Sequence, residues 1–170
     1  LEGLVMGTRS GDIDPGLFAF LHENKGMSIA EITDLLNKQS GLLGLSELSN
    51  DCRSLEEAAA NGHAGAQLAL DVFAYRLAKY IAAMTVANGH LDALVFTGGI
   101  GENSELMRTK VVQHLSFMGL AIDSQTNAAA RFGQAGIISP VGQKPLVLVI
   151  PTNEEWMIAQ DTIAVCSAIH

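Results

Sequence analysis

The sequence has few of the residues that cross-link a chain, bind zinc or span a membrane. Cys52 and Cys166 are the only cysteines among 170 residues, and neither they nor the five histidines show the spacing of a metal site. No apolar run reaches the roughly 18 residues of a membrane span, and we recognise no signal peptide. We therefore expect a cytoplasmic protein with reduced thiols and no membrane-spanning segment.

Positive charge is also scarce. The 10 lysines and arginines are outnumbered by 18 aspartates and glutamates, which gives a net charge of −8 without any basic cluster. This balance argues against nucleic acid or an anionic membrane as the main partner. It does not argue against ATP, because ATP is usually bound as its magnesium complex by local groups.

Apolar residues, by contrast, are abundant enough for a core. At 170 residues and 48% hydrophobic, the chain can form a single domain or one large lobe of a longer protein. It begins at Leu1 rather than methionine and passes directly into patterned sequence. We therefore expect it to be a piece of a longer protein.

The segment Leu94–Asn103 is the most informative part of the chain. A short apolar run ends at Thr97, three glycines follow within four residues, and a helical pattern begins at Ser104. A strand that leads through a glycine-rich turn to a helix N-terminus commonly binds phosphate groups, because backbone N–H groups can approach the ligand. The alternative is a plain strand-to-helix crossover, since the segment matches neither a Walker A loop nor Gly-x-Gly-x-x-Gly.

The periodicity of the chain predicts both helices and strands. Ser28 with Glu31, and Ser54 with Glu57, are two candidate capping boxes that would each open a helix. The first of these helices would end at Gly41, and a turn-rich stretch would follow. The predicted helices are 15–24, 28–40, 54–61, 63–88, 104–117, 125–131 and one from about residue 153, and the predicted strands are 93–97, 120–122, 137–138 and 146–150.

This order of elements predicts an α/β fold with at least two buried parallel strands, and the apolar run 146–150 predicts a strand covered on both faces. The long helix 63–88 is rich in alanine, so we expect it to be buried on more than one side. Ligands in such folds lie beyond the carboxyl ends of the strands. The two central strands end at Thr97 and Ile150, so Gly98–Asn103 and Pro151–Glu155 should lie on the same edge of the sheet.

The second of these segments carries two carboxylates. Thr152-Asn153-Glu154-Glu155 follows the last strand and opens the last helix. Carboxylates in a first helical turn often only stabilise the helix end. The functional alternative is that one of them helps to hold a hydrated Mg²⁺, which prefers oxygen ligands and takes only one or two from protein.

A single arginine lies among small and acidic residues in Gly7–Asp14. Arg9 could form a surface ion pair with Asp12 or Asp14. Alternatively, its planar guanidinium is free to neutralise charge on a phosphoryl group during transfer.

The tripeptide Asp51-Cys52-Arg53 is also open to two interpretations. It is an ordinary loop before a helix, or it contacts a nucleoside. In the second case Asp51 holds a ribose hydroxyl and Arg53 packs on a base.

Other charged and aromatic residues receive structural interpretations. We expect Arg108, Lys110 and Arg131 to be solvated charges on helix faces. His114 and Trp156 are expected to pack rather than to react.

Taken together, five segments resemble the acetate kinase family, which includes propionate kinases. The matching segments are Met6–Pro15, Ser49–Arg53, Phe96–Asn103, Ala129–Gly133 and Ile150–Glu155. They occur in the family's order and extend over nearly the whole chain, so the resemblance is specific although no single motif carries it.

The resemblance implies the actin-like ATPase (ribonuclease H-like) fold. Residues 1–170 would be its C-terminal nucleotide-binding lobe, with a mixed sheet flanked by helices. It also implies reversible, Mg²⁺-dependent transfer of the γ-phosphoryl group of ATP to a short-chain carboxylate, which gives an acyl phosphate and ADP. The motifs fit butyrate kinases less well, and they do not separate acetate from propionate.

The resemblance further implies roles for individual residues. Arg9 corresponds to the catalytic arginine that stabilises the transition state, and Glu154 to the magnesium ligand, with Glu155 as the fallback. The adenosine-side loop corresponds to Asp51, Cys52 and Arg53. The second nucleotide loop corresponds to Thr97, Gly98, Gly99, Ile100 and Gly101, with Glu102 and Asn103 beside it.

Members of this family also have an N-terminal lobe whose catalytic residues have no counterpart in this sequence. We therefore expect the chain alone not to turn over, and residues 156–170 to form a helix that packs on the absent lobe. The resemblance also implies a homodimer. The alternative from another functional class is a non-catalytic nucleotide-binding module, or a truncated product.

Overall fold

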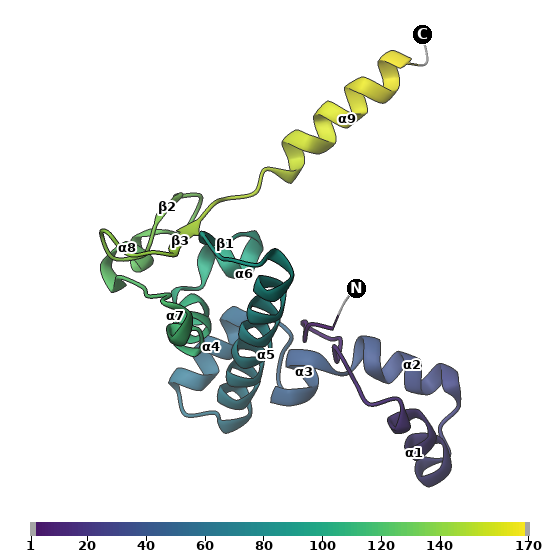
Figure 1. The fold of residues 1–170 in the computed structure, drawn as a ribbon. Helices are drawn as coiled ribbons and strands as arrows, with labels where there is room; N and C mark the ends of the chain where they lie inside the picture. Colours follow the sequence, from purple (N-terminus) through teal and green to yellow (C-terminus); the bar gives the residue numbers. More distant parts are fainter. Residues whose placement is uncertain (1–2, 169–170) are drawn as a thin grey trace.

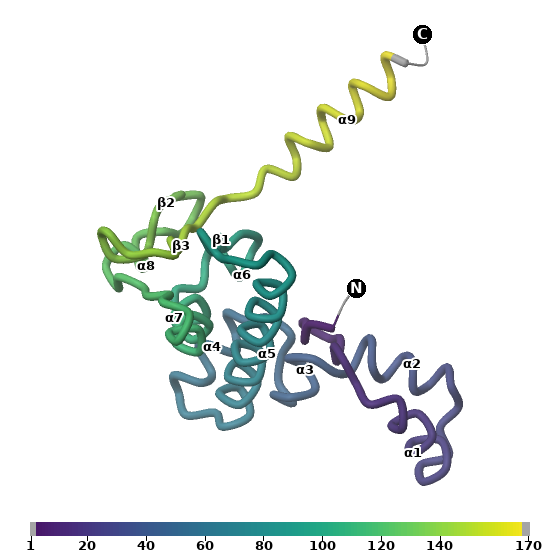
Figure 2. The backbone as a smooth tube through the Cα atoms, viewed as in Figure 1, coloured from purple at the N-terminus to yellow at the C-terminus, as the bar shows by residue number. Residues whose placement is uncertain are grey.

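Helices and short strands follow one another along the chain. The computed structural model describes residues 3–168, whose path is shown in Figures 1 and 2. In chain order its elements are α1 (Gly16–Lys25), α2 (Ile29–Lys38), α3 (Gly41–Ser46), α4 (Cys52–Ala60), α5 (Ala64–Asn88), β1 (Ala93–Phe96), α6 (Gly98–Asn103), α7 (Glu105–His114), η1 (Ser116–Met118), α8 (Ser124–Ala129), β2 (Gly136–Ile137), β3 (Leu146–Val149) and α9 (Glu154–Ala168).

The strands form a small mixed sheet in the order β1-β3-β2. β1 pairs in parallel with β3, with Ala93 opposite Leu146 and Phe96 opposite Val149. The short β2 pairs antiparallel with β3 at one edge. The predicted α/β class, the mixed sheet and the parallel pair are confirmed.

Burial of the strands differs from the prediction. In β3, Val147 and Val149 are buried while the alternate residues are only half-buried, and Val95 in β1 is 45% exposed. β3 is therefore buried on one face rather than on both, and β1 is less buried than predicted. The predicted strand at 120–122 is wrong, because this segment is irregular and is followed by a hydrogen bond from the Asp123 N–H to the Ile138 carbonyl.

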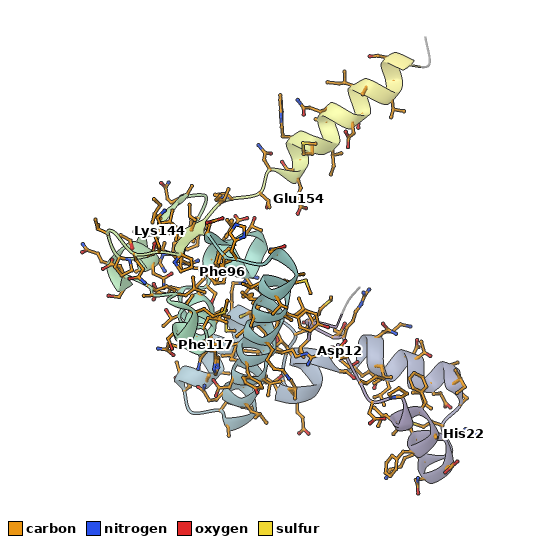
Figure 3. The ribbon with its side chains drawn as sticks, viewed as in Figure 1. Asp12, His22, Phe96, Phe117, Lys144 and Glu154 are labelled. Atoms are coloured by element: carbon orange, nitrogen blue, oxygen red, sulfur yellow. The ribbon has the colours of Figure 1, made fainter. Side chains whose placement is uncertain are left out.

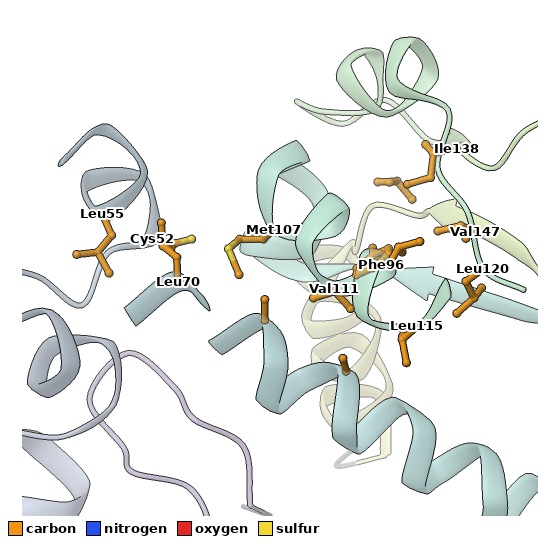
Figure 4. Packing of buried hydrophobic residues seen from close by; sticks show 14 of the residues in the cluster. Cys52, Leu55, Leu70, Phe96, Met107, Val111, Leu115, Leu120, Ile138 and Val147 are labelled. Atoms are coloured by element: carbon orange, nitrogen blue, oxygen red, sulfur yellow. The ribbon is translucent and has the colours of Figure 1, made fainter. Parts of the chain in front are cut away.

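α5 lies at the centre of the packing (Figure 1). It begins after its N-cap His63 and ends before Gly89, as the sequence predicts. Helices α3, α4 and α7 all pack against it, so burial on more than one side is confirmed. Figure 4 shows Leu70 of α5 with Met107 and Val111 of α7 in the same cluster of buried side chains.

The capping predictions have different outcomes. In the box at Ser28, the Ser28 N–H donates to Glu31 Oε2 at 2.7 Å and the Glu31 N–H donates to Ser28 Oγ at 3.3 Å, which confirms it. The box predicted at Ser54 is wrong, because Asp51 is the N-cap and α4 already begins at Cys52.

The stretch 41–53 contains the short helix α3 and is not only turns. Gly41 opens α3 instead of ending α2, and it adopts a φ of +63°. A Cβ atom at this position would lie 2.8 Å from the Arg9 carbonyl oxygen and closer still to that of Met6. Glycine is therefore needed here so that the first residues of the chain can pass close to α3.

The glycine-rich segment also differs from the prediction of a turn. It forms α6, a short helix that follows β1 directly and begins with Gly98 at a φ of +71°. The predicted helix start at Ser104 is confirmed, because Ser104 Oγ accepts a hydrogen bond from the Met107 N–H at 3.0 Å. α7 ends at His114, whose ring packs edge-on against Tyr75 with centroids 5.5 Å apart.

α9 extends away from the rest of the molecule (Figures 1 and 2). It begins where the sequence predicts, and residues 169–170 of the predicted terminal helix lie outside the described residues. Trp156 was expected to pack but is 58% exposed, and Met157, Ile158, Ile163 and Val165 are exposed as well. Within residues 3–168, no helix is long and apolar enough to cross a membrane.

Candidate functional site

Three chain segments that are far apart in the sequence meet at one groove of about 680 Å³. The first contains the start of α4, the second contains α6 and the start of α7, and the third is the turn after α8. The groove is lined by Asn50, Asp51, Cys52, Arg53, Glu56, Gly99, Ile100, Asn103, Ser104 and Phe132. Six residues of the two predicted nucleotide loops are thus brought together, whereas Thr97, Gly98, Gly101 and Glu102 lie next to the groove along the chain without lining it.

The start of α4 holds Arg53 in a fixed orientation. Asp51 Oδ1 accepts hydrogen bonds from the Arg53 N–H at 2.8 Å and from Arg53 Nε at 3.2 Å, while Asp51 Oδ2 accepts one from Nη2 at 2.8 Å. These bonds to Arg53 lower the pKa of Asp51 to about 2. The Arg53 side chain is 87% exposed, so a fixed guanidinium stands in the groove and is open to a ligand.

Cys52 is structural rather than reactive in this arrangement. Burial, with a smaller contribution from the Glu56 carboxylate, raises the pKa of its thiol to about 12. The thiol donates a weak hydrogen bond to Glu56 Oε1 at 3.5 Å, and Ser104 Oγ donates to the same oxygen. Glu56 therefore joins the start of α4 to the start of α7 beneath the groove.

The glycines of α6 leave room for a ligand. A Cβ atom placed at Gly98 or Gly99 would meet no other atom within 4 Å. By contrast, a Cβ at Gly101 would lie 3.4 Å from the backbone of Phe96, so this glycine packs against β1. The open space beside Gly98 and Gly99 leaves room for phosphate oxygens, although the Gly98 N–H itself already donates to Glu102 Oε1.

Glu102 ties the ends of the two parallel strands together. Its Oε1 accepts hydrogen bonds from the Gly98 N–H at 2.9 Å, from the Thr152 N–H at 2.8 Å and from Thr152 Oγ1 at 3.0 Å. The bond from the Thr152 N–H is the main reason why the pKa of Glu102 is lowered. The prediction that the segments after β1 and β3 share one edge is confirmed by these bonds.

Arg108 is the residue that sequence reasoning placed most wrongly. It is fully buried on α7 instead of being solvated, and its guanidinium donates five hydrogen bonds. The acceptors are Gly101 O at 2.8 Å, Glu102 O at 2.9 Å, Asn127 Oδ1 at 2.6 Å, Asn127 O at 2.7 Å and Ala130 O at 3.0 Å. Burial lowers its pKa, and the carbonyl oxygens compensate for the lost water.

Lys110 is also less solvated than we expected, whereas Arg131 is exposed as predicted. Lys110 Nζ donates to Asp71 Oδ1 of α5 at 2.6 Å. The guanidinium carbon of Arg131 lies 5.2 Å from the centroid of the Phe132 ring.

Arg9 lies on a strap that runs beside α2 and α3 and does not line the groove. The strap is held by backbone hydrogen bonds such as that from the Ser40 N–H to the Thr8 carbonyl at 2.9 Å. Neither predicted ion pair of Arg9 forms, since Asp12 contacts Arg76 and Asp14 accepts from the Gly16 N–H at 2.7 Å. Among residues 3–168, no group bonds to the half-buried Arg9 guanidinium.

Glu154 is the first residue of α9 and is exposed (Figure 3). Nowhere in the described part of the chain do three or more His, Cys, Asp or Glu side chains gather as a metal site would need. One or two carboxylates fit Mg²⁺ when phosphates and water supply its remaining oxygen ligands. Glu154 and Glu155 are two exposed carboxylates of this kind, and neither lines the groove.

Asn50, Glu56, Ser104 and Phe132 line the groove but received no role from the sequence. Phe132 belongs to one of the segments that carry the family resemblance, so its place in that segment could have marked it as a groove residue. The other three are polar residues that become recognisable only when α4 and α7 are placed side by side.

The chain belongs to the acetokinase family, whose model matches residues 1–160.

Among curated relatives, acetate kinase 1 of Neisseria meningitidis is 66% identical over 162 residues, which cover 95% of this chain and 41% of that protein. The acetate kinase of Shewanella frigidimarina is 59% identical over 168 residues, 99% of this chain and 42% of that protein. The chain therefore spans about two fifths of the length of these relatives.

Solved structures show the same fold. The acetate kinase of Porphyromonas gingivalis superposes with a TM-score of 0.88 at 48% identity, over 97% of this chain and 41% of that one. A propionate kinase from Francisella tularensis gives a TM-score of 0.86 at 46% identity, over 94% of this chain and 40% of that one.

Proposed function

We propose that this chain is the nucleotide-binding lobe of a kinase that transfers the γ-phosphoryl group of ATP to acetate or propionate. The observation that carries the proposal is the groove in which the start of α4 faces α6. The names of the relatives, acetate kinase and propionate kinase, supply the class of acceptor. Of these two acids, the described residues favour neither.

In the proposed reaction, a carboxylate oxygen of the acid attacks the γ-phosphorus. The bond from that phosphorus to the bridging oxygen of ADP breaks, so acyl phosphate and ADP form without net proton transfer. The acid is already ionised at pH 7 and needs no general base. Catalysis then consists of positioning and of neutralising charge on the transferred group.

The groove residues take the nucleotide roles in this proposal. Asp51 and Arg53, with Cys52 between them, contact the adenosine side. The residues from Thr97 to Asn103 contact the phosphate side, where Gly98 and Gly99 leave open space. Glu154, with Glu155 as the fallback, is the protein ligand of Mg²⁺, which when bound neutralises charge on the phosphate oxygens.

Calorimetric titration of the chain with Mg·ADP and Mg·ATP tests the groove. We expect Gly99→Val to abolish binding, because the new side chain would fill the space beside α6. Gly136→Val in β2 is the matched control, since that glycine also has open space around it and lies outside the groove. Unchanged binding by the Gly99 variant would refute the site.

Arg9 is proposed to neutralise charge on the transferring phosphoryl group. Its guanidinium has no partner among the described residues, so it is available to a ligand. In a full-length protein that contains this chain, Arg9→Ala should lower kcat by about 10³-fold or more and weaken ATP binding much less. Equal losses in both would mean that Arg9 only holds ground-state phosphate.

The chain alone is proposed to bind nucleotide without turning over, because it spans about two fifths of its relatives. A coupled assay that finds acyl phosphate formation at a substantial rate would contradict this. The proposal extends to a cytoplasmic homodimer of the full-length protein, in which α9 packs on the N-terminal lobe.

A non-catalytic nucleotide-binding module is the second candidate. It is favoured by one observation, namely that Arg9 does not line the groove. A full-length protein that binds ATP but forms no acyl phosphate would decide for this module.

A further inference from the structure

Phe132 is a large apolar side chain in an unexpected place. It is 78% exposed, it takes no part in the hydrophobic core, and it lines the same groove as the start of α4. Exposing an aromatic ring to water costs free energy that burial elsewhere would recover. A ring held at the wall of a ligand groove is explained if a flat apolar ligand covers it.

The backbone of Phe132 is held in an unfavourable conformation. Its φ of +54° lies in the left-handed region, which bulky residues rarely occupy. The Phe132 N–H donates to Asn103 Oδ1 at 3.1 Å, and the carbonyl of Ala130 two residues earlier accepts from the buried Arg108 at 3.0 Å. Phe132 and Gly133, whose φ is +83°, are the central residues of a tight turn that is closed by a hydrogen bond from the Gln134 N–H to the Arg131 carbonyl at 3.1 Å. The turn therefore accounts for the positive φ, which a bulky residue adopts only at a cost.

The same contacts connect Phe132 to the phosphate side of the groove. Asn103, which receives the Phe132 N–H, also donates from Nδ2 to the Gly99 carbonyl at 3.0 Å. The backbone of Phe132 is thus tied to α6 through Asn103. Arg131 lies over the ring at 5.2 Å from its centroid, which restrains the ring further.

We propose that Phe132 is the stacking platform for the base of the nucleotide and makes the groove prefer purines over pyrimidines. This inference rests on the proposed function, because it assigns one part of the nucleotide to one residue of the same groove. Stacking depends on the overlap of flat surfaces and does not read the edge of the base. The ring therefore favours the larger purine over a pyrimidine without separating adenine from guanine.

The test measures binding of four ligands to the 170-residue chain by calorimetry. The ligands are the magnesium complexes of ATP, GTP and UTP, and inorganic tripolyphosphate, which has no base. Phe132→Ala should weaken ATP and GTP binding about 5- to 50-fold, weaken UTP binding less, and leave tripolyphosphate binding unchanged. Phe132→Trp should retain the preference for purines.

Two further variants separate stacking from folding. Phe117→Ala removes a ring that is 77% exposed outside the groove and should change no affinity. Phe132→Gly removes the ring and also accepts the positive φ, so it should raise thermal stability while it weakens purine binding. A loss of affinity in a variant of higher stability cannot come from misfolding.

The possible outcomes are distinct. If the wild-type chain binds neither nucleotides nor tripolyphosphate, the proposed function fails. If it binds all four ligands, but Phe132→Ala weakens them equally or not at all, the stacking role is refuted and the ring belongs to a protein contact. Selective loss of purine affinity supports the inference.

Discussion

The region around the groove and helix α9 differ sharply in how their side chains are buried and paired. Around the groove, a fully buried arginine finds five acceptors, and among the described residues no buried side-chain nitrogen or oxygen lacks a partner. On α9, every described side chain up to Ser167 is exposed, including those of Trp156 and Ile158. The polar groups buried around the groove are thus paired within this chain, whereas α9 presents apolar side chains to solvent.

The largest effect on stability is expected when the buried Arg108 beside the groove loses its hydrogen bonds. Arg108→Met keeps the length of the side chain but leaves the carbonyl oxygens of Gly101, Glu102 and Ala130 without their donor. We expect a loss of more than about 3 kcal/mol in the free energy of unfolding, measured by urea denaturation followed by circular dichroism. Arg131→Met, on an exposed arginine, should change it by less than about 0.5 kcal/mol. Similar values for both variants would show that the buried network contributes little.

A smaller effect is expected where the strap of Arg9 crosses α3. Gly41→Ala adds both an unfavourable positive φ and a collision with the backbone of Met6 and Arg9, so it should cost about 2–4 kcal/mol. Gly62→Ala shares the positive φ, +87°, but has nothing within 4 Å, and should cost about 1 kcal/mol. Equal losses of stability in the two variants would mean that the strap shifts to make room for the new Cβ at little cost. Thermal unfolding of both variants makes the comparison.

The tie between the ends of β1 and β3 should be weaker and dependent on pH. Because the pKa of Glu102 is lowered in the folded state, its contribution to stability is present above the ordinary glutamate pKa of about 4.3 and is lost as pH falls through the lowered value. The stability difference between wild type and Glu102→Gln, of about 1 kcal/mol at pH 7, should therefore shrink toward pH 3. A difference that stays constant or grows on acidification would exclude this role. Glu57→Gln, on an exposed face of α4, is the control.

The smallest effect on stability is expected when helix α9 is removed. Removing residues 154–170 should change the unfolding free energy of the remaining chain by less than about 0.5 kcal/mol, because every side chain of residues 154–167 is exposed. It should also reduce association of the chain at high concentration, measured by sedimentation velocity. A stability loss above about 1 kcal/mol would show that α9 packs on this chain after all.

The elements that could be predicted are those whose signals are local. Helix α5 follows from apolar spacing over 25 residues, and the box at Ser28 follows from two residues three positions apart. The parallel pair of β1 and β3 follows from two short apolar runs. The placement of the nucleotide segments on one edge then follows from topology alone.

The parts that could not be predicted depend on contacts between distant residues. Glycine is a poor helix former, so the helix α6 in Gly98–Asn103 contradicts local propensity and is held by the caps of Glu102 and Arg108. Arg108 finds its acceptors on α6 and α8, and charged residues are rarely buried without such partners. Likewise, Asp51 and not Ser54 is the N-cap of α4, although both residues have side chains suited to this position.

The contrast between Cys52 and Cys166 has a practical consequence. The Cys52 thiol is enclosed and hardly ionised near neutral pH, whereas Cys166 stands in solvent on α9. A maleimide dye added to the folded protein would therefore mark α9 selectively and report when that helix finds a docking surface. Cys52 would react with the dye only when the start of α4 opens and exposes its thiol to solvent.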